Sequence, residues 1–431
     1  MFDKHERECI IGLIKREVVP AIGCTEPIAV ALCVARATEL LGGLPERIEA
    51  RLSANILKNA MGVGIPGTGM VGLPIAIALG ATIGRSEYQL EVLKDCTPEA
   101  VERGKEYIAG GAINISLKEG ITEKLYIEIE VTGADGGSAM AIIAGGHTNF
   151  VYERAGAEVL KDEKFGTSAE ECADEPQLSL RKVYDFAMTA PLDEIRFILE
   201  TRDLNKAAAE KSFAGRYGHQ LGRVMRNSIS ERKVLGDNTF SRIVSYTSAA
   251  CDARMAGAMI PVMSNSGSGN QGITATMPVV VYAEDNGNSE EELIRALTLS
   301  HLTVIYIKQS LGRLSALCGC VVAASGSSCG ITYLMGGSYE QISYAVKNMV
   351  GNLTGMLCDG AKPSCALKVS SGVSTAVFSA ILAMENHTVS SVEGIVDEDV
   401  DLTIHNLTSI GREAMNETDR MVLDIMTHKS C

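Results

Sequence analysis

The sequence has too little positive charge for a nucleic-acid-binding protein. Its 431 residues include 39 Lys and Arg against 53 Asp and Glu, which gives a formal net charge of −14 at pH 7. Contact with phosphate groups requires a basic surface, so nucleic acid is excluded as the expected partner. Hydrophobic residues make up 46% of the chain and charged residues 21%, which is typical of a globular protein with a buried core. A chain of this length is expected to form two or three domains.

The N-terminus lacks the apolar stretch of a secretory signal. Charged residues recur between Asp3 and Glu17, so no uninterrupted apolar segment of a signal peptide fits there. We therefore expect a cytoplasmic protein, in which thiols are kept reduced. The 12 cysteines are also too sparse for a small disulfide-bonded scaffold, so they indicate reduced thiols, metal ligands or catalysis.

Long runs of strongly apolar residues are missing as well. Residues 63–84 and 316–337 carry no charge and are long enough to cross a bilayer. The first run is interrupted by prolines and glycines, and the second is rich in Gly, Ser, Ala and Cys. We expect both segments to be buried and tightly packed, and we expect no membrane partner.

Helical and strand patterns occupy separate blocks of the chain. Apolar residues at helical spacing predict a helix over 3–19 and a second over 27–41, with Thr25 as the N-cap of the second. Residues 124–132 alternate apolar and polar, which predicts a half-buried antiparallel strand. Similar patterns predict strands over 47–53, 138–144 and 148–153, a helix over 97–108, and a polar, glycine-rich loop over 55–69.

These blocks predict an α+β fold. A mostly helical main domain would comprise residues 1–47 and 165–431, because helix follows helix after a polar stretch at 161–177. A smaller α+β module with an antiparallel sheet would be inserted as residues 48–164.

Histidine spacing typical of a metal site is absent. The seven His are scattered, without H-x3-H or HExxH. Cysteines are instead concentrated in one region, at Cys318, Cys320, Cys329, Cys358 and Cys365. Their spacing does not suit zinc, whereas three thiolates from a helix and a loop would suit an iron–sulfur cluster with one iron open to substrate. The alternative is that they are small buried residues that pack helices.

Cys24 lies just before a predicted helix. The helix dipole and the free amides at that position would lower the pKa of its thiol, while the adjacent Glu26 would oppose the effect by charge repulsion. Cys24 is therefore a candidate base or nucleophile, with a plain packing residue as the alternative.

Two glycine-rich segments lack the motifs of nucleotide or pyridoxal phosphate enzymes. Residues 62–69 have no G-K-S/T ending and form no P-loop. Lys58, just before them, is a candidate for pairing with a carboxylate or an ordinary solvated lysine. Residues 264–272 open a predicted helix and would cradle a carboxylate or phosphate, or form a tight entry turn. They resemble the substrate loop of pyridoxal phosphate eliminases, but no Schiff-base lysine motif lies upstream, so no pyridoxal phosphate is expected.

Several of these features occur together in a known family. The runs PAIGCTEP (20–27) and SNSGSGNQG (264–272), with the three later cysteines, resemble the L-cysteine desulfidases, which belong with the serine dehydratase alpha-chain-like proteins. The resemblance implies an oxygen-sensitive 4Fe-4S cluster held by Cys318, Cys358 and Cys365, with Cys320 as a competitor for the first position. It also implies that Cys24 is the catalytic base and that the inserted module corresponds to the beta domain of serine dehydratases.

The sequence differs from the serine dehydratases in the spacing of the cluster ligands and shares a terminal cysteine with some of them. The second and third cluster ligands lie closer together here than in those enzymes. Some of them end in a cysteine that occupies the open iron, which makes Cys431 a hypothetical ligand, although a terminal residue is by default frayed and exposed.

The expected reaction is α,β-elimination of L-cysteine to hydrogen sulfide, ammonia and pyruvate, with iron as Lewis acid and Cys24 as base. The alternatives are a dehydratase or deaminase of L-serine or another small amino acid on the same scaffold, and a non-catalytic iron–sulfur redox or oxygen sensor. The expected partners are a small amino-acid substrate and a second copy of the chain in a homodimer. The α-carboxylate is expected to be held by Ser264, Asn265, Ser266, Gly267, Asn270 and Gln271, with Asn55 and Lys58 as further candidates.

Overall fold

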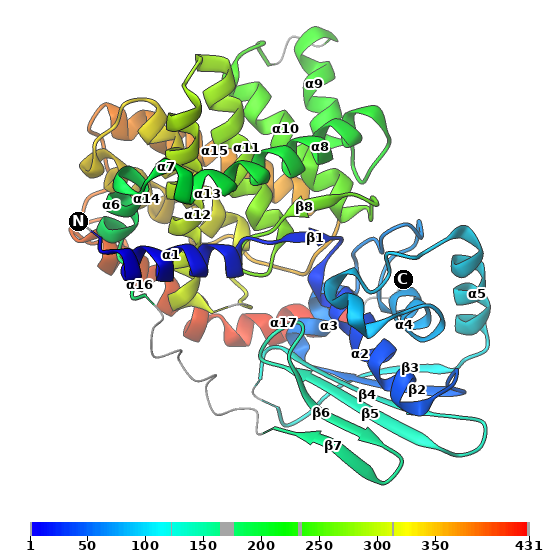
Figure 1. Cartoon of the computed structure of the whole chain (residues 1–431). Coiled ribbons are helices and arrows are strands. Elements are labelled where there is room, and N and C mark those ends of the chain that lie inside the picture. Colours follow the sequence, from blue (N-terminus) through cyan, green and yellow to red (C-terminus); the bar gives the residue numbers. More distant parts are fainter. Residues whose placement is uncertain (1, 122, 164–175, 232–234, 313, 429–431) are drawn as a thin grey trace.

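Two large hydrophobic clusters form most of the core of the protein. The larger cluster lies among helices, and the smaller one lies between a sheet and the helices that cover it. Figure 1 shows the helical region and the sheet region side by side. This arrangement confirms the predicted α+β fold class. The computed structural model describes residues 2–121, 123–163, 176–231, 235–312 and 314–428.

In the helical region, α13 (Gly319–Leu334) is a central helix that packs against α11, α12, α14 and α15. Its glycines allow the close approach, because a Cβ at Gly326 would lie 2.4 Å from the carbonyl oxygen of Ser300 on α12. The segment 316–337 is therefore buried packing, as predicted. The other helices of this region are α1 (Lys4–Glu17), α6 (Leu180–Thr189), α7 (Leu192–Ile195), α8 (Leu199–Ala214), α9 (Leu221–Glu231), α10 (Thr239–Met255), α11 (Gly269–Asn286), α12 (Glu290–Leu311), α14 (Tyr339–Leu353), α15 (Cys365–Met384), α16 (Val400–Ser409) and α17 (Asn416–Thr427).

The sheet region contains six strands in the order β3-β2-β4-β5-β6-β7. Neighbouring strands pair antiparallel, except that β3 runs parallel to β2. One face of the sheet is covered by α2, and α4 and α5 pack beyond it. The elements of this region are α2 (Thr25–Leu41), β2 (Arg47–Leu52), α3 (Ala54–Ala60), α4 (Leu73–Thr82), α5 (Pro98–Ala109), β3 (Ile113–Leu117), β4 (Tyr126–Thr132), β5 (Ser138–Ala144), β6 (Phe150–Ala155) and β7 (Glu158–Asp162).

Three local expectations are corrected by these elements. The segment 55–69 is not all loop, because α3 occupies its first part. The sheet is mixed rather than purely antiparallel, because the unpredicted strand β3 pairs parallel to β2. β3 lies at the edge of the sheet, where a strand needs no strong apolar alternation. The helix predicted from 27 begins at Thr25, so that Cys24 and not Thr25 is its N-cap.

Packing does not follow the expected domain boundary at residue 47. The buried residues of α2, such as Val30 and Leu32, belong to the cluster that includes Ile127 and Ile129 of the sheet. The sheet region thus draws its covering helix from the segment N-terminal to that boundary.

One helix, α15, is long and apolar enough to cross a membrane, and half of its most apolar window is buried inside the protein. It packs against α10, α13 and α14.

A buried ion pair connects the two regions. Lys58 of α3 is 1% exposed and pairs with Asp419 of α17. The same ammonium group donates to the carbonyl oxygen of Cys358 at 3.2 Å, and the Asn55 amide donates to Asp419 Oδ2 at 3.1 Å. Gly360 lies against the end of α3, where a Cβ would be 2.3 Å from the carbonyl oxygen of Lys58. Lys58 therefore supports the loop that carries Cys358.

We expect Asp419→Ala to lower the free energy of unfolding by about 3–5 kcal/mol, because it leaves the Lys58 ammonium buried without a carboxylate. Urea denaturation followed by circular dichroism measures the change. Asp424→Ala, at an exposed position of the same helix, is the matched control and should stay within about 0.5 kcal/mol of wild type. A loss below about 1 kcal/mol in Asp419→Ala would contradict the structural role of the pair.

Candidate active site

A short antiparallel pairing joins two loops that are about 240 residues apart in the chain. β1 (Pro20–Ile22) pairs with β8 (Pro261–Met263), and Pro20 lies opposite Met263. Beyond the strands, the backbone amides of Ser264 and Ser266 donate to carbonyl oxygens of the N-terminal segment, each at 2.9 Å. The Thr25 hydroxyl donates to the Gly267 carbonyl oxygen at 2.8 Å. The pairing therefore holds the Cys24 loop against the glycine-rich loop.

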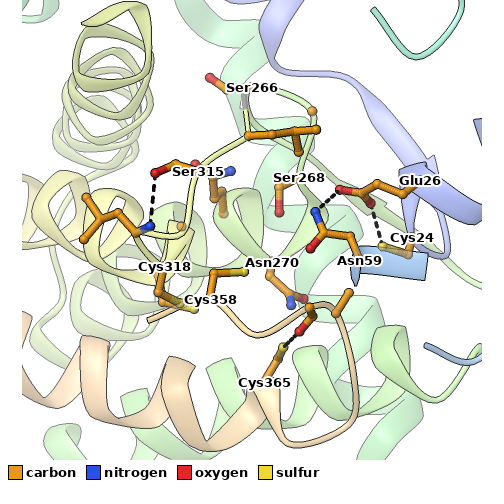
Figure 2. Close-up of a pocket in the computed structure, with 18 of the residues that line it drawn as sticks. Cys24, Glu26, Asn59, Ser266, Ser268, Asn270, Ser315, Cys318, Cys358 and Cys365 are labelled. Carbon is orange, nitrogen blue, oxygen red and sulfur yellow. Dashed lines mark hydrogen bonds between the residues drawn. The ribbon is translucent and has the colours of Figure 1, made fainter. Parts of the chain in front are cut away.

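Cys24 is a buried residue at the N-terminus of α2. The preceding Gly23 has a φ of +75°, and a Cβ there would lie 2.4 Å from Pro66, so the turn requires glycine. The Cys24 thiol donates to Glu26 Oε2 at 2.9 Å, and the Asn59 amide donates to Glu26 Oε1 at 3.2 Å. Figure 2 shows these three residues together on one side of the pocket.

The environment of Cys24 differs from the expectation. Burial raises the pKa of the Cys24 thiol well above its usual range, and the negative charge of Glu26 raises it further. Arg254 lowers this pKa, but its effect is smaller. The predicted lowering by the helix N-terminus was therefore wrong, because desolvation and a neighbouring carboxylate outweigh it.

Glu26 is the ionised partner of the pair. Burial raises the pKa of its carboxyl group, but the positive charge of His147 and the hydrogen bond from Cys24 offset this effect and leave the pKa below its usual value. The proton shared by the pair therefore resides on the Cys24 sulfur.

Three of the later cysteines line the same pocket as Cys24. Cys318 is the N-cap of α13, Cys358 lies in the loop before α15, and Cys365 is the first residue of α15. Two backbone hydrogen bonds join the segment of Cys318 to the segment of Cys358. The Cys318 amide donates to the carbonyl oxygen of Met356 at 3.0 Å, and the Cys358 amide donates to the carbonyl oxygen of Ala316 at 2.7 Å. Figure 2 shows Cys318 and Cys358 across the pocket from Cys24.

Cys320 also lines this pocket and is buried. Its thiol interacts with Cys318, which lowers the pKa of Cys318 to about 7 despite burial and raises the pKa of Cys320. Cys318 is therefore the more readily ionised member of the two. Cys431 lies outside the described residues.

The thiol set fits a polynuclear cluster better than a single metal ion. Within the described ranges, no three His, Cys, Asp or Glu side chains are close enough to bind one ion. Cys318, Cys358 and Cys365 nevertheless line one pocket, which is partly open to solvent. An iron–sulfur cluster holds its thiolates farther apart than a single ion does, and cysteine thiolate is its usual ligand. These residues therefore fit the expected cofactor.

The glycine-rich loop is divided between the pocket and the core. Ser266, Gly267, Asn270 and Gln271 line the pocket. Ser264 and Asn265 do not, because the Ser264 hydroxyl donates to the Val19 carbonyl oxygen at 2.6 Å and Asn265 is directed toward His301.

Asn55 and Lys58 are not brought to the pocket. Both contact Asp419 in the joint between α3 and α17.

Several residues of the pocket were not predicted as site residues from the sequence. Glu26 was considered only for its repulsion of Cys24, and His147 was only one of the seven scattered histidines. Arg254, which shares the small-residue run SAACDARMAGA with one other charged residue, Asp252, could have been detected by that contrast. The remaining unpredicted residues are Asn59, Ser268, Lys308, Leu314, Ser315, Leu317, Gly319, Gly360 and Ala361.

Comparison with known proteins identifies the family. A sequence profile described as serine dehydratase alpha chain matches residues 87–424. The chain belongs to this family. The predicted resemblance is confirmed at this level, and the matched segment contains Cys318, Cys358 and Cys365. Cys24 lies N-terminal to it.

Relatives match the chain over nearly its full length. A UPF0597 protein of Phocaeicola vulgatus is 75% identical over 431 residues, covering 100% of both chains. A UPF0597 protein of Porphyromonas gingivalis is 57% identical over 99% of this chain and 100% of its own. UPF0597 protein PBPRB0240 of Photobacterium profundum is 46% identical over 97% of this chain and 98% of its own. These names state no activity, so the substrate is argued from the site.

A buried histidine holds the base of the glycine-rich loop. The Asn265 amide donates to His301 Nδ1 at 3.0 Å, so the ring proton lies on Nε2, which is 3.0 Å from the Thr276 hydroxyl. Ser266 donates to Asn265 Oδ1 at 2.8 Å, which supports this orientation of the amide. His301 is fully buried, and burial lowers its pKa to about 3, so the ring is neutral.

We expect acid to destabilise the protein through His301. Below pH about 6.5 the unfolded chain binds a proton that the folded chain does not, so the free energy of unfolding falls by about 1.4 kcal/mol per pH unit until the pH approaches 3. Urea titrations between pH 7 and pH 5 measure the slope. In His301→Gln the slope should be smaller by this amount, whereas the exposed control His405→Gln should keep the wild-type slope. Equal slopes in wild type and His301→Gln would contradict the assignment.

Proposed function

We propose that this protein is an iron–sulfur-dependent lyase that eliminates hydrogen sulfide from L-cysteine and yields pyruvate and ammonia. The observation that carries the proposal is one pocket that contains Cys24 on one side and Cys318, Cys358 and Cys365 on the other. Membership in the serine dehydratase alpha chain family supports the reaction class. L-cysteine itself is inferred from the thiol at position 24, which the resemblance associates with the desulfidases.

The proton leaves the substrate through the pair formed by Cys24 and Glu26. Glu26 Oε2 lies 2.9 Å from the Cys24 sulfur and accepts its proton, which leaves a thiolate. The thiolate then removes the proton from the α-carbon of the substrate. The electron pair of that C–H bond forms the double bond between the α- and β-carbons, and the C–S bond breaks with its electron pair on sulfur. The sulfur leaves as hydrogen sulfide with the proton that Glu26 had accepted, which returns Cys24 and Glu26 to their starting states.

A neighbouring residue keeps Glu26 in position to accept the proton from Cys24. The Asn59 amide donates to Glu26 Oε1 at 3.2 Å, which holds the carboxylate beside Cys24. A positioned general base contributes about 100- to 10,000-fold to the rate in comparable enzymes. The aminoacrylate that leaves the site tautomerises and takes up one water to give pyruvate and ammonia.

Cys318, Cys358 and Cys365 would hold the cluster. When bound, a 4Fe-4S cluster with one iron not held by the protein supplies a Lewis acid for the leaving sulfur. Lys368 lies beside the loop that carries these ligands and donates to the Leu357 carbonyl oxygen at 2.6 Å. Its positive charge partly compensates for thiolate charge at Cys318 and Cys358.

L-serine dehydration on the same site is the second candidate. The family match favours it, because the profile is that of serine dehydratases. A hydroxyl in place of the substrate thiol changes the leaving group but none of the residues that hold the backbone of the amino acid.

The cysteine ligands are tested by substitution under anaerobic conditions. After reconstitution with iron and sulfide, we expect Cys358→Ser to lose the broad visible absorption of the cluster and the release of sulfide and pyruvate from L-cysteine. Cys329→Ser, at a buried cysteine of α13 that does not line the pocket, is the matched control and should retain both. Turnover of L-cysteine that persists in Cys358→Ser sinks the cluster mechanism. Pyruvate formation from L-serine, measured in parallel, decides between the two candidate substrates.

Cys24 is tested separately from the cluster. We expect Cys24→Ala to lower kcat for L-cysteine by about 100-fold or more, because the base is lost, while the cluster absorption is retained. Cys33→Ala, a fully buried cysteine on the same helix, should keep kcat within about threefold. An unchanged kcat in Cys24→Ala removes Cys24 from the mechanism and leaves the cluster role intact.

A further inference from the structure

Arg254 is a buried cation that forms no direct ion pair among the described residues, although its charge also acts on the Glu26 carboxylate. It lies near the end of α10, is 3% exposed, and lines the pocket that contains Cys24 and the later cysteines. Its Nε donates to the Gly23 carbonyl oxygen at 3.1 Å. Among the described residues it forms no ion pair, and its two terminal nitrogens donate no hydrogen bond. A buried guanidinium group with unpaired nitrogens destabilises the folded protein unless an anion binds to it.

The guanidinium crosses the N-terminus of α11. A Cβ at Gly269, the first residue of that helix, would lie 2.2 Å from Arg254 Nε, so glycine is required for the crossing. The N-cap Ser268 forms no side-chain capping bond. The partial positive charge at the N-terminus of α11 and the full positive charge of Arg254 thus lie close together, and no carboxylate of the described residues is hydrogen-bonded to Arg254. An anion bound at this point would relieve the repulsion and accept hydrogen bonds from both.

Two unpartnered acceptors line the same pocket. Asn59 Oδ1 and Gln271 Oε1 are buried and accept no hydrogen bond. Asn59 is fixed in this orientation because its amide nitrogen donates to Glu26. Figure 2 shows Asn59 beside Glu26, at the side of the pocket that carries Cys24. Buried acceptors without partners require a donor, and an ammonium group supplies three.

We propose that Arg254 binds the α-carboxylate of the substrate at the N-terminus of α11 and that Asn59 and Gln271 accept hydrogen bonds from the α-ammonium group. The proposal deepens the proposed function and rests on it for the amino-acid substrate. It replaces the sequence-based expectation that the glycine-rich loop, with Asn55 and Lys58 as further candidates, holds the carboxylate. Because Arg254 carries a full charge, substrate selection depends on the free α-carboxylate of the amino acid rather than on its side chain.

The test uses binding as well as turnover, so that it does not depend on the reaction. L-Alanine has the carboxylate and the ammonium group but no leaving group, and L-alaninamide lacks the carboxylate. Calorimetry on the reconstituted full-length protein should give L-alanine about 30-fold or more tighter binding than L-alaninamide, because truncating one partner of a buried charge pair costs at least this factor.

We expect Arg254→Gln to weaken L-alanine binding by about 30-fold and to bring the preference over L-alaninamide to about twofold or less. Arg254→Lys keeps the positive charge but lacks the planar set of guanidinium donors, so it should retain part of the preference for L-alanine over L-alaninamide. Arg242→Gln is the matched control on the same helix, where Arg242 pairs with Asp285 at the surface, and should bind as wild type. Circular dichroism and the melting temperature establish that each variant is folded.

The outcomes separate the two proposals. Unchanged L-alanine selectivity in folded Arg254→Gln, or in Arg254→Lys if the Gln variant does not fold, overturns the assignment of Arg254 even when L-cysteine is turned over. Selectivity that depends on Arg254 without turnover of L-cysteine or L-serine upholds the binding site and overturns the proposed function. In the active enzyme, Arg254→Gln should raise KM for L-cysteine more than it lowers kcat.

Discussion

The candidate active site depends on the antiparallel pairing of β1 with β8. This pairing joins Pro20–Ile22 to Pro261–Met263 and places the loop of Cys24 against the glycine-rich loop. Gly272 lets α11 pack closely against β8, because a Cβ there would lie 2.0 Å from the carbonyl oxygen of Met263. Without the pairing, Cys24, Arg254 and the N-terminus of α11 would have no fixed relation to one another.

Burial without full charge compensation distinguishes this pocket from the rest of the core. In the joint between α3 and α17, the buried Lys58 has a carboxylate partner in Asp419. In the pocket, Arg254 forms no ion pair with a carboxylate of the described residues, while Glu26 retains a proton donor in Cys24. A low-dielectric pocket strengthens these interactions and favours a ligand that carries both a negative and a positive group. The zwitterionic backbone of an amino acid has this charge distribution.

Local patterns were sufficient for much of the fold. The helix over Pro98–Ala109 was predicted from its Thr97 cap, and the strands Tyr126–Thr132 and Ser138–Ala144 were predicted from alternation or turn signals. The prediction missed β3, an edge strand with a parallel partner, and the short helix α3 inside a polar segment. In both cases the structure is stabilised by contacts with distant residues rather than by the local pattern.

The sequence by itself determined the α+β class, the family resemblance, and the three cysteines and Cys24 as candidates for one site. Only the tertiary structure decided which polar residues join them. It directed Lys58 and Asn55 to Asp419 and brought Arg254, Glu26 and Asn59 to the pocket. It also reversed the expected pKa shift of Cys24, because burial and the distance to a carboxylate depend on packing across the whole chain. The spacing of residues along the sequence gives neither the burial of a side chain nor its distance to a carboxylate.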